Sequence, residues 1–182
     1  MTIDAVSVRY AQALFDVAKA AGRLDAALEQ LESLAGQLQR HEPLRRLLLN
    51  PDMELDDKLA LCGTAVGGAW QEDAQAFVRA VLSFGRAALL ADMAVAFRAL
   101  VDEDRKVARV TVRSAHPLTD SLRASLTAAL ERSERRTITL VEETAPELIG
   151  GLQVTVGHRM MDGSLKGRLA ELRQRLKRVK VP

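Results

Sequence analysis

The chain has 182 residues, 48% of them hydrophobic and 27% charged, with a formal net charge of +2. This length suffices for one domain or two small ones, and the composition is that of an ordinary soluble protein. The mild charge permits nucleic-acid binding without demanding it, and an aromatic content of 3% offers few platforms for base stacking. No apolar run approaches the roughly 18 residues of a membrane span. We therefore expect any membrane contact to be indirect, through partners.

The first hundred or so residues have the pattern of helices alone. Leucine and alanine dominate, β-branched residues are few, and apolar residues recur at steps of three and four. The spacing predicts helices over about residues 3–21, 24–38, 44–49, 56–65, 72–84 and 90–104. Because their connections are short, six such helices are expected to form a compact bundle.

The first predicted helix carries more apolar surface than a simple bundle requires. One stripe runs through Tyr10 and Val17, and a neighbouring stripe contains Phe15. A helix with two apolar stripes is either deeply buried or contacts both its own core and a partner. The sequence leaves both options open.

Near residue 105 the hydrophobic period changes from that of a helix to that of a strand. Alternation predicts strands over about 108–112, 137–140 and 152–156, and Gly157-His158 is a plausible hairpin turn toward Met160-Met161. Thr119 can cap a helix whose expected apolar face is Leu118, Leu122, Leu126 and Leu130. The fold class is therefore predicted as mainly α, with a six-helix bundle in residues 1–105 and a small α+β domain in residues 106–182.

The last helix is predicted to begin after Asp162-Gly163, a tight-turn dipeptide, with Ser164 as its N-cap. Its apolar stripe consists of Leu165, Leu169, Leu172, Leu176 and Val179, and its other faces are basic. Upstream, Gly150 and Gly151 indicate a turn or bulge where the backbone passes close or takes a positive φ, or else a surface that a partner approaches. We favour the structural interpretation.

The sequence lacks the motifs of the common catalytic sites. It has no Gly-Lys-Ser/Thr triplet, no Gly-x-Ser-x-Gly elbow and no Gly-x-Gly-x-x-Gly turn. His41, His116 and His158 are far apart and have no second ligand at metal-like spacing. We therefore expect no enzyme, no cofactor and no metal. The alternative function is nucleic-acid binding through the basic last helix, which the mild charge and scarce aromatics disfavour.

Several short segments, in a fixed order along the whole chain, point to one family. They are Arg9-Tyr10-Ala11 with Ala13-Leu14-Phe15, Asn50-Pro51, Gly85-Arg86, Ser114-Ala115-His116-Pro117-Leu118, Leu148-Ile149-Gly150-Gly151, Asp162-Gly163-Ser164 and Gly167-Arg168-Leu169. Together they resemble the delta subunit family of the F-type ATP synthase, which includes the mitochondrial oligomycin sensitivity-conferring protein. Ala145 and Met160-Met161 depart from the family's usual residues. These departures affect the detail expected of the C-terminal surface and not the resemblance itself.

The resemblance implies a non-catalytic connector in the stator, without cofactors, on the cytoplasmic face of the bacterial inner membrane. The N-terminal bundle would hold the N-terminal helix of an alpha subunit between its first and fifth helices, and the C-terminal domain would bind the b subunits. The alpha-subunit contacts expected from it are Tyr10, Leu14, Phe15, Phe77, Val78, Val81 and Leu82. For each of these, an internal core position is the alternative.

For the b-subunit contact, the residues expected on the last helix are Arg168, Arg173 and Arg175. A solvated face that keeps the domain soluble is the alternative for these arginines. Gly150, Gly151, Asp162 and Gly163 are expected to serve as structural turns.

Overall fold

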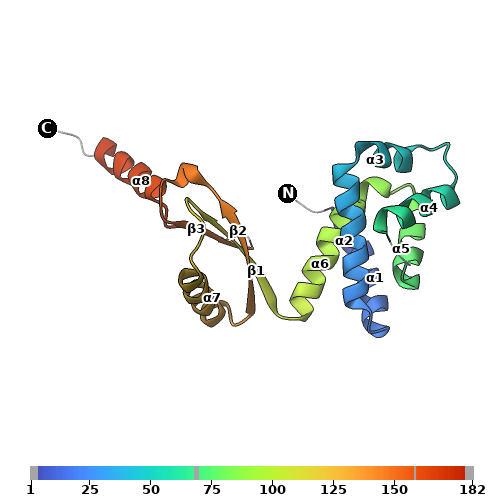
Figure 1. Cartoon of the computed structure of the whole chain (residues 1–182), viewed down its shortest axis with the longest axis horizontal. Helices are drawn as coiled ribbons and strands as arrows, with labels where there is room; N and C mark the ends of the chain where they lie inside the picture. Colours follow the sequence, from blue (N-terminus) through green and yellow to red (C-terminus); the bar gives the residue numbers. More distant parts are fainter. Residues whose placement is uncertain (1–3, 68–69, 158, 179–182) are drawn as a thin grey trace. The chain divides into compact units, whose positions relative to one another are not determined.

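The computed structural model describes residues 4–67, 70–157 and 159–178. The chain is mostly helical, with a small four-stranded sheet in its C-terminal part, as predicted (Figure 1). It divides into two compact units, Met1–Val101 and Asp102–Pro182. The division falls in the last turn of helix α6 (Leu90–Asp104), a few residues before the boundary predicted from the change of period.

The first unit consists of helices that match the predicted ones to within a few residues at each end. Before α6 come α1 (Ala5–Ala20), α2 (Leu24–Arg40), α3 (Glu42–Leu49), α4 (Leu55–Val66), α5 (Glu72–Ser83) and the short 3-10 helix η1 (Ala87–Leu89). The Asp4 carboxylate accepts a hydrogen bond of 3.1 Å from the Val6 amide and so caps α1. Gly67 ends α4 in a left-handed conformation with φ of 75°, and Gly68 lies outside the described residues.

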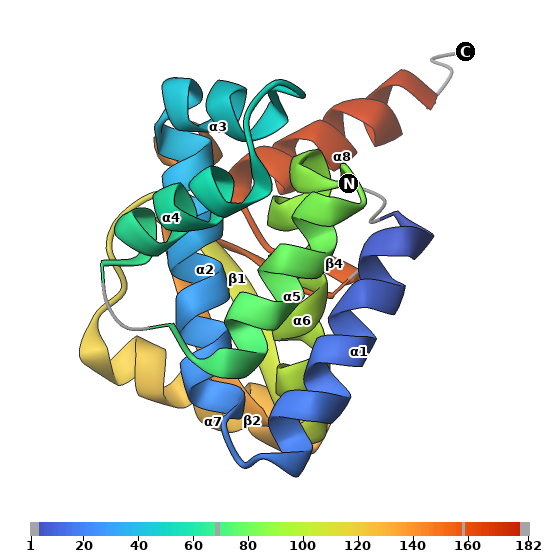
Figure 2. The same cartoon turned by 90° about the vertical axis from the view of Figure 1, so that its right-hand side faces the viewer.

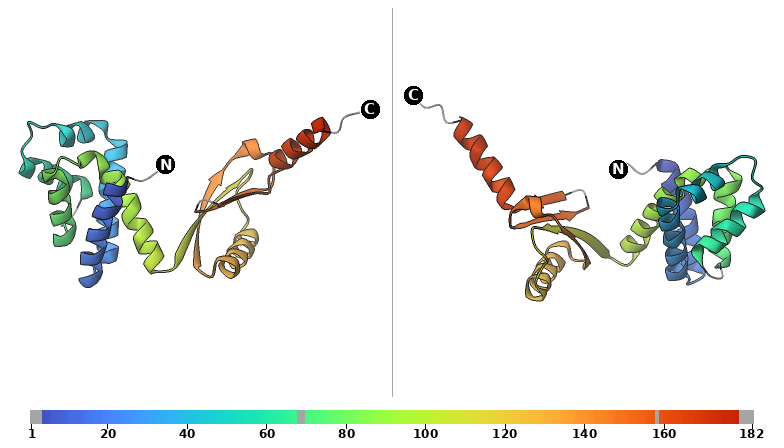
Figure 3. Two further views of the ribbon diagram at one scale, coloured as in Figure 1. Left: turned by 180° about the vertical axis from the view of Figure 1, so that it is seen from behind. Right: turned by 45° about the horizontal axis from the view of Figure 1, so that its top comes forward.

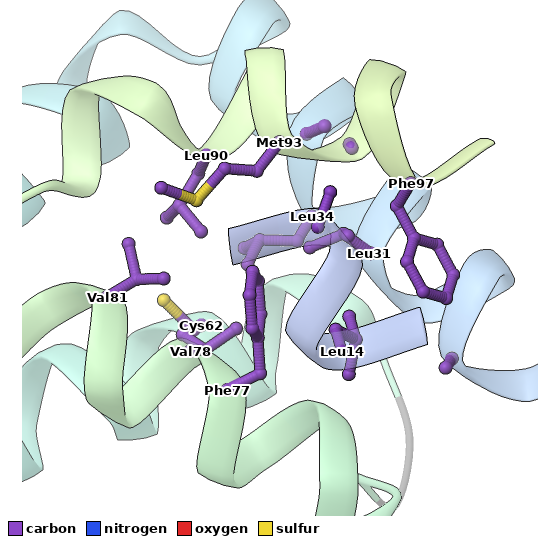
Figure 4. Close-up of a cluster of buried hydrophobic side chains, with 14 of the residues drawn as sticks. Leu14, Leu31, Leu34, Cys62, Phe77, Val78, Val81, Leu90, Met93 and Phe97 are labelled. Atoms are coloured by element: carbon purple, nitrogen blue, oxygen red, sulfur yellow. The ribbon is translucent and has the colours of Figure 1, made fainter. Parts of the chain in front are cut away.

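The core of this unit is one continuous cluster of aliphatic and aromatic side chains (Figure 4). Leu31 and Leu34 from α2 meet Leu90, Met93 and Phe97 from α6, and all five are at most 2% exposed. Each fully buried side chain of this size stabilises the fold by roughly 1.5–3 kcal/mol. The unit therefore has a core of its own.

The second unit contains the sheet. Its strands are β1 (Val107–Ser114), β2 (Thr137–Thr144), β3 (Leu152–Val156) and β4 (Arg159–Asp162), in the order β2-β1-β3-β4. Strands β1 and β2 are parallel and joined by α7 (Asp120–Glu134), whereas β3 pairs antiparallel with β1 and with β4. The predicted hairpin turn thus joins β3 to β4 at Gly157, whose φ is 57°, and His158 lies outside the described residues.

Helix α7 lies against one face of this sheet (Figure 3). Val110 and Val112 of β1 are fully buried there, and Leu130 of α7 packs in the same cluster. Leu122 departs from the predicted apolar face, because it is 43% exposed. Residues four apart drift by about 40° around a helix with each step, which turns Leu122 away from the stripe that ends at Leu130.

The final helix α8 (Leu165–Arg178) extends away from the sheet (Figure 3). It contacts η2 (Pro146–Leu148), a short 3-10 helix between β2 and β3. The position of α8 is therefore set at its first turn, where the predicted turn residues gather.

Candidate functional site

A groove between α1 and α5 encloses a cavity of about 600 Å³. The two helices lie alongside one another in Figure 2, where α1 is blue and α5 green. The lining residues are Arg9, Tyr10, Ala13, Leu14 and Val17 from α1, and Glu72, Asp73, Ala76, Phe77 and Ala80 from α5.

The groove exists because small residues stand where the two helices face solvent. Ala13, Ala76 and Ala80 present only methyl groups, while the buried Leu14 and Phe77 close the space beneath them. In addition, Val17 is 54% exposed. An apolar groove of this length and lining suits the apolar face of an amphipathic helix.

Contacts between the two helices show that they run antiparallel. Near the start of α1, the Tyr10 and Phe77 rings meet edge to face at 6.4 Å, and Arg86, just after α5, donates a hydrogen bond of 2.6 Å to the Tyr10 hydroxyl. Just after α1, Arg23 donates two hydrogen bonds, of 2.9 and 2.8 Å, to the carboxylate of Asp73 at the start of α5. These contacts tie the two helices together at both ends of the groove.

The structure separates the predicted head-facing residues into two groups. Tyr10, Leu14 and Phe77 line the groove. The remaining residues belong to the core cluster and are at most 8% exposed; they are Phe15, Val78, Val81 and Leu82. Figure 4 shows Val78 and Val81 among the buried side chains.

The physical reason is that each helix has two apolar faces, and periodicity does not say which of them points inward. Phe15 lies on the inward stripe of α1, while Ala13 and Val17 lie on the outward one. Four further residues line the groove that were not predicted from the sequence: Ala13, Val17, Ala76 and Ala80. The available signal was a run of small or short apolar residues on the weaker stripe.

A second unpartnered apolar surface lies on α8. Its leucine stripe, Leu165, Leu169, Leu172 and Leu176, is exposed by 46%, 57%, 53% and 66% respectively. Val179, the last predicted member of the stripe, lies outside the described residues. Four exposed leucines at steps of four, three and four form the narrow seam typical of a helix that pairs with another helix.

The arginines predicted to contact the stalk flank this stripe. Arg168, Arg173 and Arg175 are all exposed. Arg175 forms an ion pair of 2.6 Å with Glu171 one turn earlier, an arrangement that stabilises an exposed helix only slightly. The leucines were not among the residues predicted to bind, and an amphipathic helix normally buries its apolar stripe.

The predicted turn residues meet where α8 begins. The Ser164 hydroxyl accepts a hydrogen bond of 3.0 Å from the Gly167 amide, which is the expected N-cap. Asp162 accepts a hydrogen bond of 2.8 Å from the Ser164 amide. Hydrogen bonds from the side chain and amide of Ser164, and from Gln153, lower the pKa of the Asp162 carboxyl.

The two neighbouring glycines differ in what they permit. Gly151 has a φ of 78°, and a Cβ there would lie 2.4 Å from the carbonyl oxygen of Gly163, so only glycine fits. A Cβ at Gly150 would instead lie 2.9 Å from a terminal methyl of Leu165, a side chain that is exposed and can move. Close backbone approach is thus required at Gly151 alone.

Reactive groups are few in the part of the chain that the structure describes. Within it, no three histidine, cysteine or acidic side chains come together as a metal site, and no helix is long and apolar enough to cross a membrane. Burial raises the pKa of the Cys62 thiol to about 11, which keeps it protonated and unreactive near neutral pH. The described residues thus present two exposed apolar surfaces, the groove between α1 and α5 and the leucine stripe of α8.

Residues 6–176 match the sequence profile of the ATP synthase delta (OSCP) subunit. The chain belongs to this family. It is 35% identical over 181 residues to ATP synthase subunit delta of Azorhizobium caulinodans, covering 98% of this chain and 96% of that protein. It is 33% identical over 175 residues to the subunit of the same name from Myxococcus xanthus, covering 94% and 96% of the two chains.

A solved structure has the same fold. A chain of the mitochondrial ATP synthase hexamer of Toxoplasma gondii superimposes with a TM-score of 0.73 at 22% identity, covering 98% of this chain and 99% of that chain. The family membership confirms the resemblance drawn from the short segments. The delta-family subunit is a non-catalytic component of the ATP synthase stator.

Proposed function

We propose that this chain ties the catalytic head of ATP synthase to the peripheral stalk, so that rotor torque drives ATP synthesis. In this proposal α1 to α6 act as a six-helix bundle, and its groove between α1 and α5 holds the N-terminal helix of an alpha subunit. The C-terminal unit binds the ends of the b subunits. The single observation that carries the proposal is the open apolar groove on a unit whose own core is already complete.

The groove suits a stator because its contact is chiefly apolar. Burial of apolar surface stabilises a complex by about 25 cal/mol per Å², and it accumulates along a groove without depending on salt. A helix that places side chains over Ala13, Ala76 and Ala80 would bury Val17 and cover the rings of Tyr10 and Phe77. The catalytic head would then be held against torque without any bond being made or broken.

The C-terminal unit offers the second attachment through α8. We propose that the leucine stripe packs against a helix of the b subunits, and that Arg168, Arg173 and Arg175 meet acidic residues at the rim of that contact. Charges at a rim chiefly set the association rate and its salt dependence. Through these two surfaces the chain would sit peripherally, on the cytoplasmic face of the bacterial inner membrane, as part of the assembled enzyme.

The head-facing contact is tested by titrating the full chain with a synthetic peptide of the alpha-subunit N-terminal helix. Ala76→Glu places a charged side chain in the groove at an exposed position, whereas Gln75→Glu adds the same charge at the neighbouring exposed position outside it. We expect the peptide to shift backbone amide signals of α1 and α5, and Ala76→Glu to abolish binding. Equal binding to both variants would contradict the assignment of the groove.

Leu14 and Val78 are unsuitable for this test, because both are at most 3% exposed. An aspartate at either position would leave a charge in the core and unfold the unit, so loss of binding would carry no information about the groove. The exposed pair of neighbours on α5 avoids this difficulty.

A further inference from the structure

The groove between α1 and α5 carries opposite charges at its two ends, and we propose that these charges fix the direction of the docked helix. Its N-terminal turn lies beside Arg9 and its C-terminal turn beside Glu72, so that the helix runs parallel to α1. The occupant is an amphipathic helix with acidic residues in its first turn and basic residues in its last. This inference rests on the proposed function and specifies the chemistry of that same site.

The two ends of the groove are defined by the antiparallel course of its walls. Arg9 lies near the start of α1, at the end where Arg86 reaches the Tyr10 hydroxyl. Glu72 opens α5, next to Asp73, which pairs with Arg23 beyond the end of α1. From Arg9 to Val17 the wall spans nine residues, and the eight steps between them rise by about 12 Å. The groove therefore accepts slightly more than two turns of helix.

The end beside Glu72 has an excess of negative charge. Asp73 is neutralised by Arg23, through hydrogen bonds of 2.9 and 2.8 Å. Glu72 is exposed, and within the described residues no ion pair is recorded for it. One carboxylate thus remains to attract a cation from a docked helix.

The opposite end has an excess of positive charge. Arg9 is exposed and has no recorded ion-pair partner in the described part of the chain. Arg86 is bound to a neutral phenol oxygen and lies over the Tyr10 ring, 5.1 Å from its centroid, so its charge is not cancelled. The acidic residue nearest in sequence, Asp4, uses its carboxylate to cap α1. This end therefore attracts an anionic group.

A free helix already prefers the charge pattern that this groove complements. The partial positive charge of a helix N-terminus favours acidic residues in the first turn, and the C-terminus favours basic residues in the last. Parallel to α1, such a helix brings its acidic turn to Arg9 and Arg86 and its basic turn to Glu72. In the reverse direction, each end of the docked helix would lie beside groove residues of the same charge. This repulsion would disfavour the reverse orientation.

The direction is measured with the full chain and the alpha-subunit N-terminal peptide carrying a nitroxide spin label at one end or the other. We expect the label on the peptide's N-terminus to broaden the amide signals of Arg9 and Arg86, and the label on its C-terminus to broaden those of Glu72 and Asp73. The opposite pattern would overturn the direction while leaving the groove as the binding site. A peptide that does not bind would instead contradict the proposed function.

Charge exchange tests the cause of the direction. Arg9→Glu combined with Glu72→Arg reverses both ends at constant net charge, and we expect it to weaken binding of the ordinary peptide by about tenfold or more. A peptide with its own terminal charges exchanged should bind this double variant better than it binds the natural chain. Glu29→Arg combined with Arg40→Glu is the matched control on exposed positions of α2, outside the groove. Unchanged affinity of both peptides for the groove variant would overturn the inference.

Discussion

The guanidinium of Arg86 donates a hydrogen bond of 2.6 Å to the hydroxyl oxygen of Tyr10, 76 residues earlier in the chain. The same guanidinium lies 5.1 Å from the centroid of the Tyr10 ring. The Tyr10 ring also packs edge to face against the ring of Phe77. The contact between Arg86 and Tyr10 fixes the loop after α5 against α1 at one end of the groove. The contact that positions the two walls of the groove should therefore also stabilise the first unit.

We expect Tyr10→Phe to lower the free energy of unfolding by about 1 kcal/mol, because it removes one partly buried hydrogen bond and keeps the ring. The measurement is urea unfolding of Tyr10→Phe, Arg86→Ala and the double variant. A coupling energy of about 0.5–1.5 kcal/mol between the two sites is expected. Strictly additive effects would show that the contact does not stabilise the unit.

Substitutions in the leucine stripe of α8 should impair binding to the b subunits without lowering the stability of the fold. Leu169 and Leu172 are both more than half exposed, so replacing both with aspartate should change the free energy of unfolding by no more than about 0.5 kcal/mol per site. The same double variant should lose binding to a peptide from the C-terminal end of a b subunit. The measurements are thermal unfolding and isothermal titration.

Arg168→Gln combined with Arg173→Gln is the control for charge on the same helix. It should retain binding but slow the association and flatten its salt dependence. If the leucine variant bound the b-subunit peptide as tightly as the natural chain, α8 would not be the stalk contact.

Alanine substitutions at two glycines with positive φ distinguish two causes of destabilisation, an unfavourable backbone conformation and a steric clash. Gly157→Ala meets no atom within 4 Å, so it should cost roughly 1–2 kcal/mol through its left-handed conformation alone. Gly151→Ala adds a Cβ 2.4 Å from the Gly163 carbonyl oxygen and should destabilise the second unit by clearly more. Chemical unfolding of both variants provides the comparison, and equal losses would refute the close approach at Gly151.

Much of the fold could be predicted from the sequence, because spacing and turn chemistry act locally. Gly151 and Ser164 illustrate this: a glycine before a strand and a serine before an amphipathic run have the structural roles that their neighbours indicate. The order of strands in the sheet could not be predicted in the same way. Strand β1 pairs with β2 and β3, whose residues lie far from it in the sequence, and a local pattern does not say which strands will be neighbours.

The resemblance to the family implied a groove between the first and fifth helices, but of the seven residues expected there only Tyr10, Leu14 and Phe77 line it. Phe15 and Val17 are both apolar and two residues apart, yet one packs in the core and the other lines the groove. Periodicity gives the angle between two such stripes, and only packing against the other helices decides which of them is buried. On α1, Ala11 and Ala18 are buried beside Phe15, whereas Ala13 lines the groove with Val17.

The start of α8 should weaken in acid. The pKa of Asp162 is lowered in the folded chain, so its stabilising contribution is fully present above its unfolded pKa of about 3.9 and is lost as the pH falls through the lower folded value. We expect the carboxyl carbon of Asp162 to titrate with a midpoint below 3.9 in an NMR experiment. Asp162→Asn keeps an acceptor oxygen without the charge and should remove this pH dependence, whereas a midpoint at or above 3.9 would contradict the hydrogen-bond arrangement.

Whether the groove between α1 and α5 holds the catalytic head can be measured in the assembled enzyme. Membranes stripped of this subunit and of catalytic heads are recombined with heads and with either variant of α5, and the heads that rebind are measured. We expect Gln75→Glu to restore rebinding and ATP-driven proton pumping, and Ala76→Glu to leave the heads unbound although the chain is folded. Full rebinding and pumping with Ala76→Glu would contradict this role of the groove.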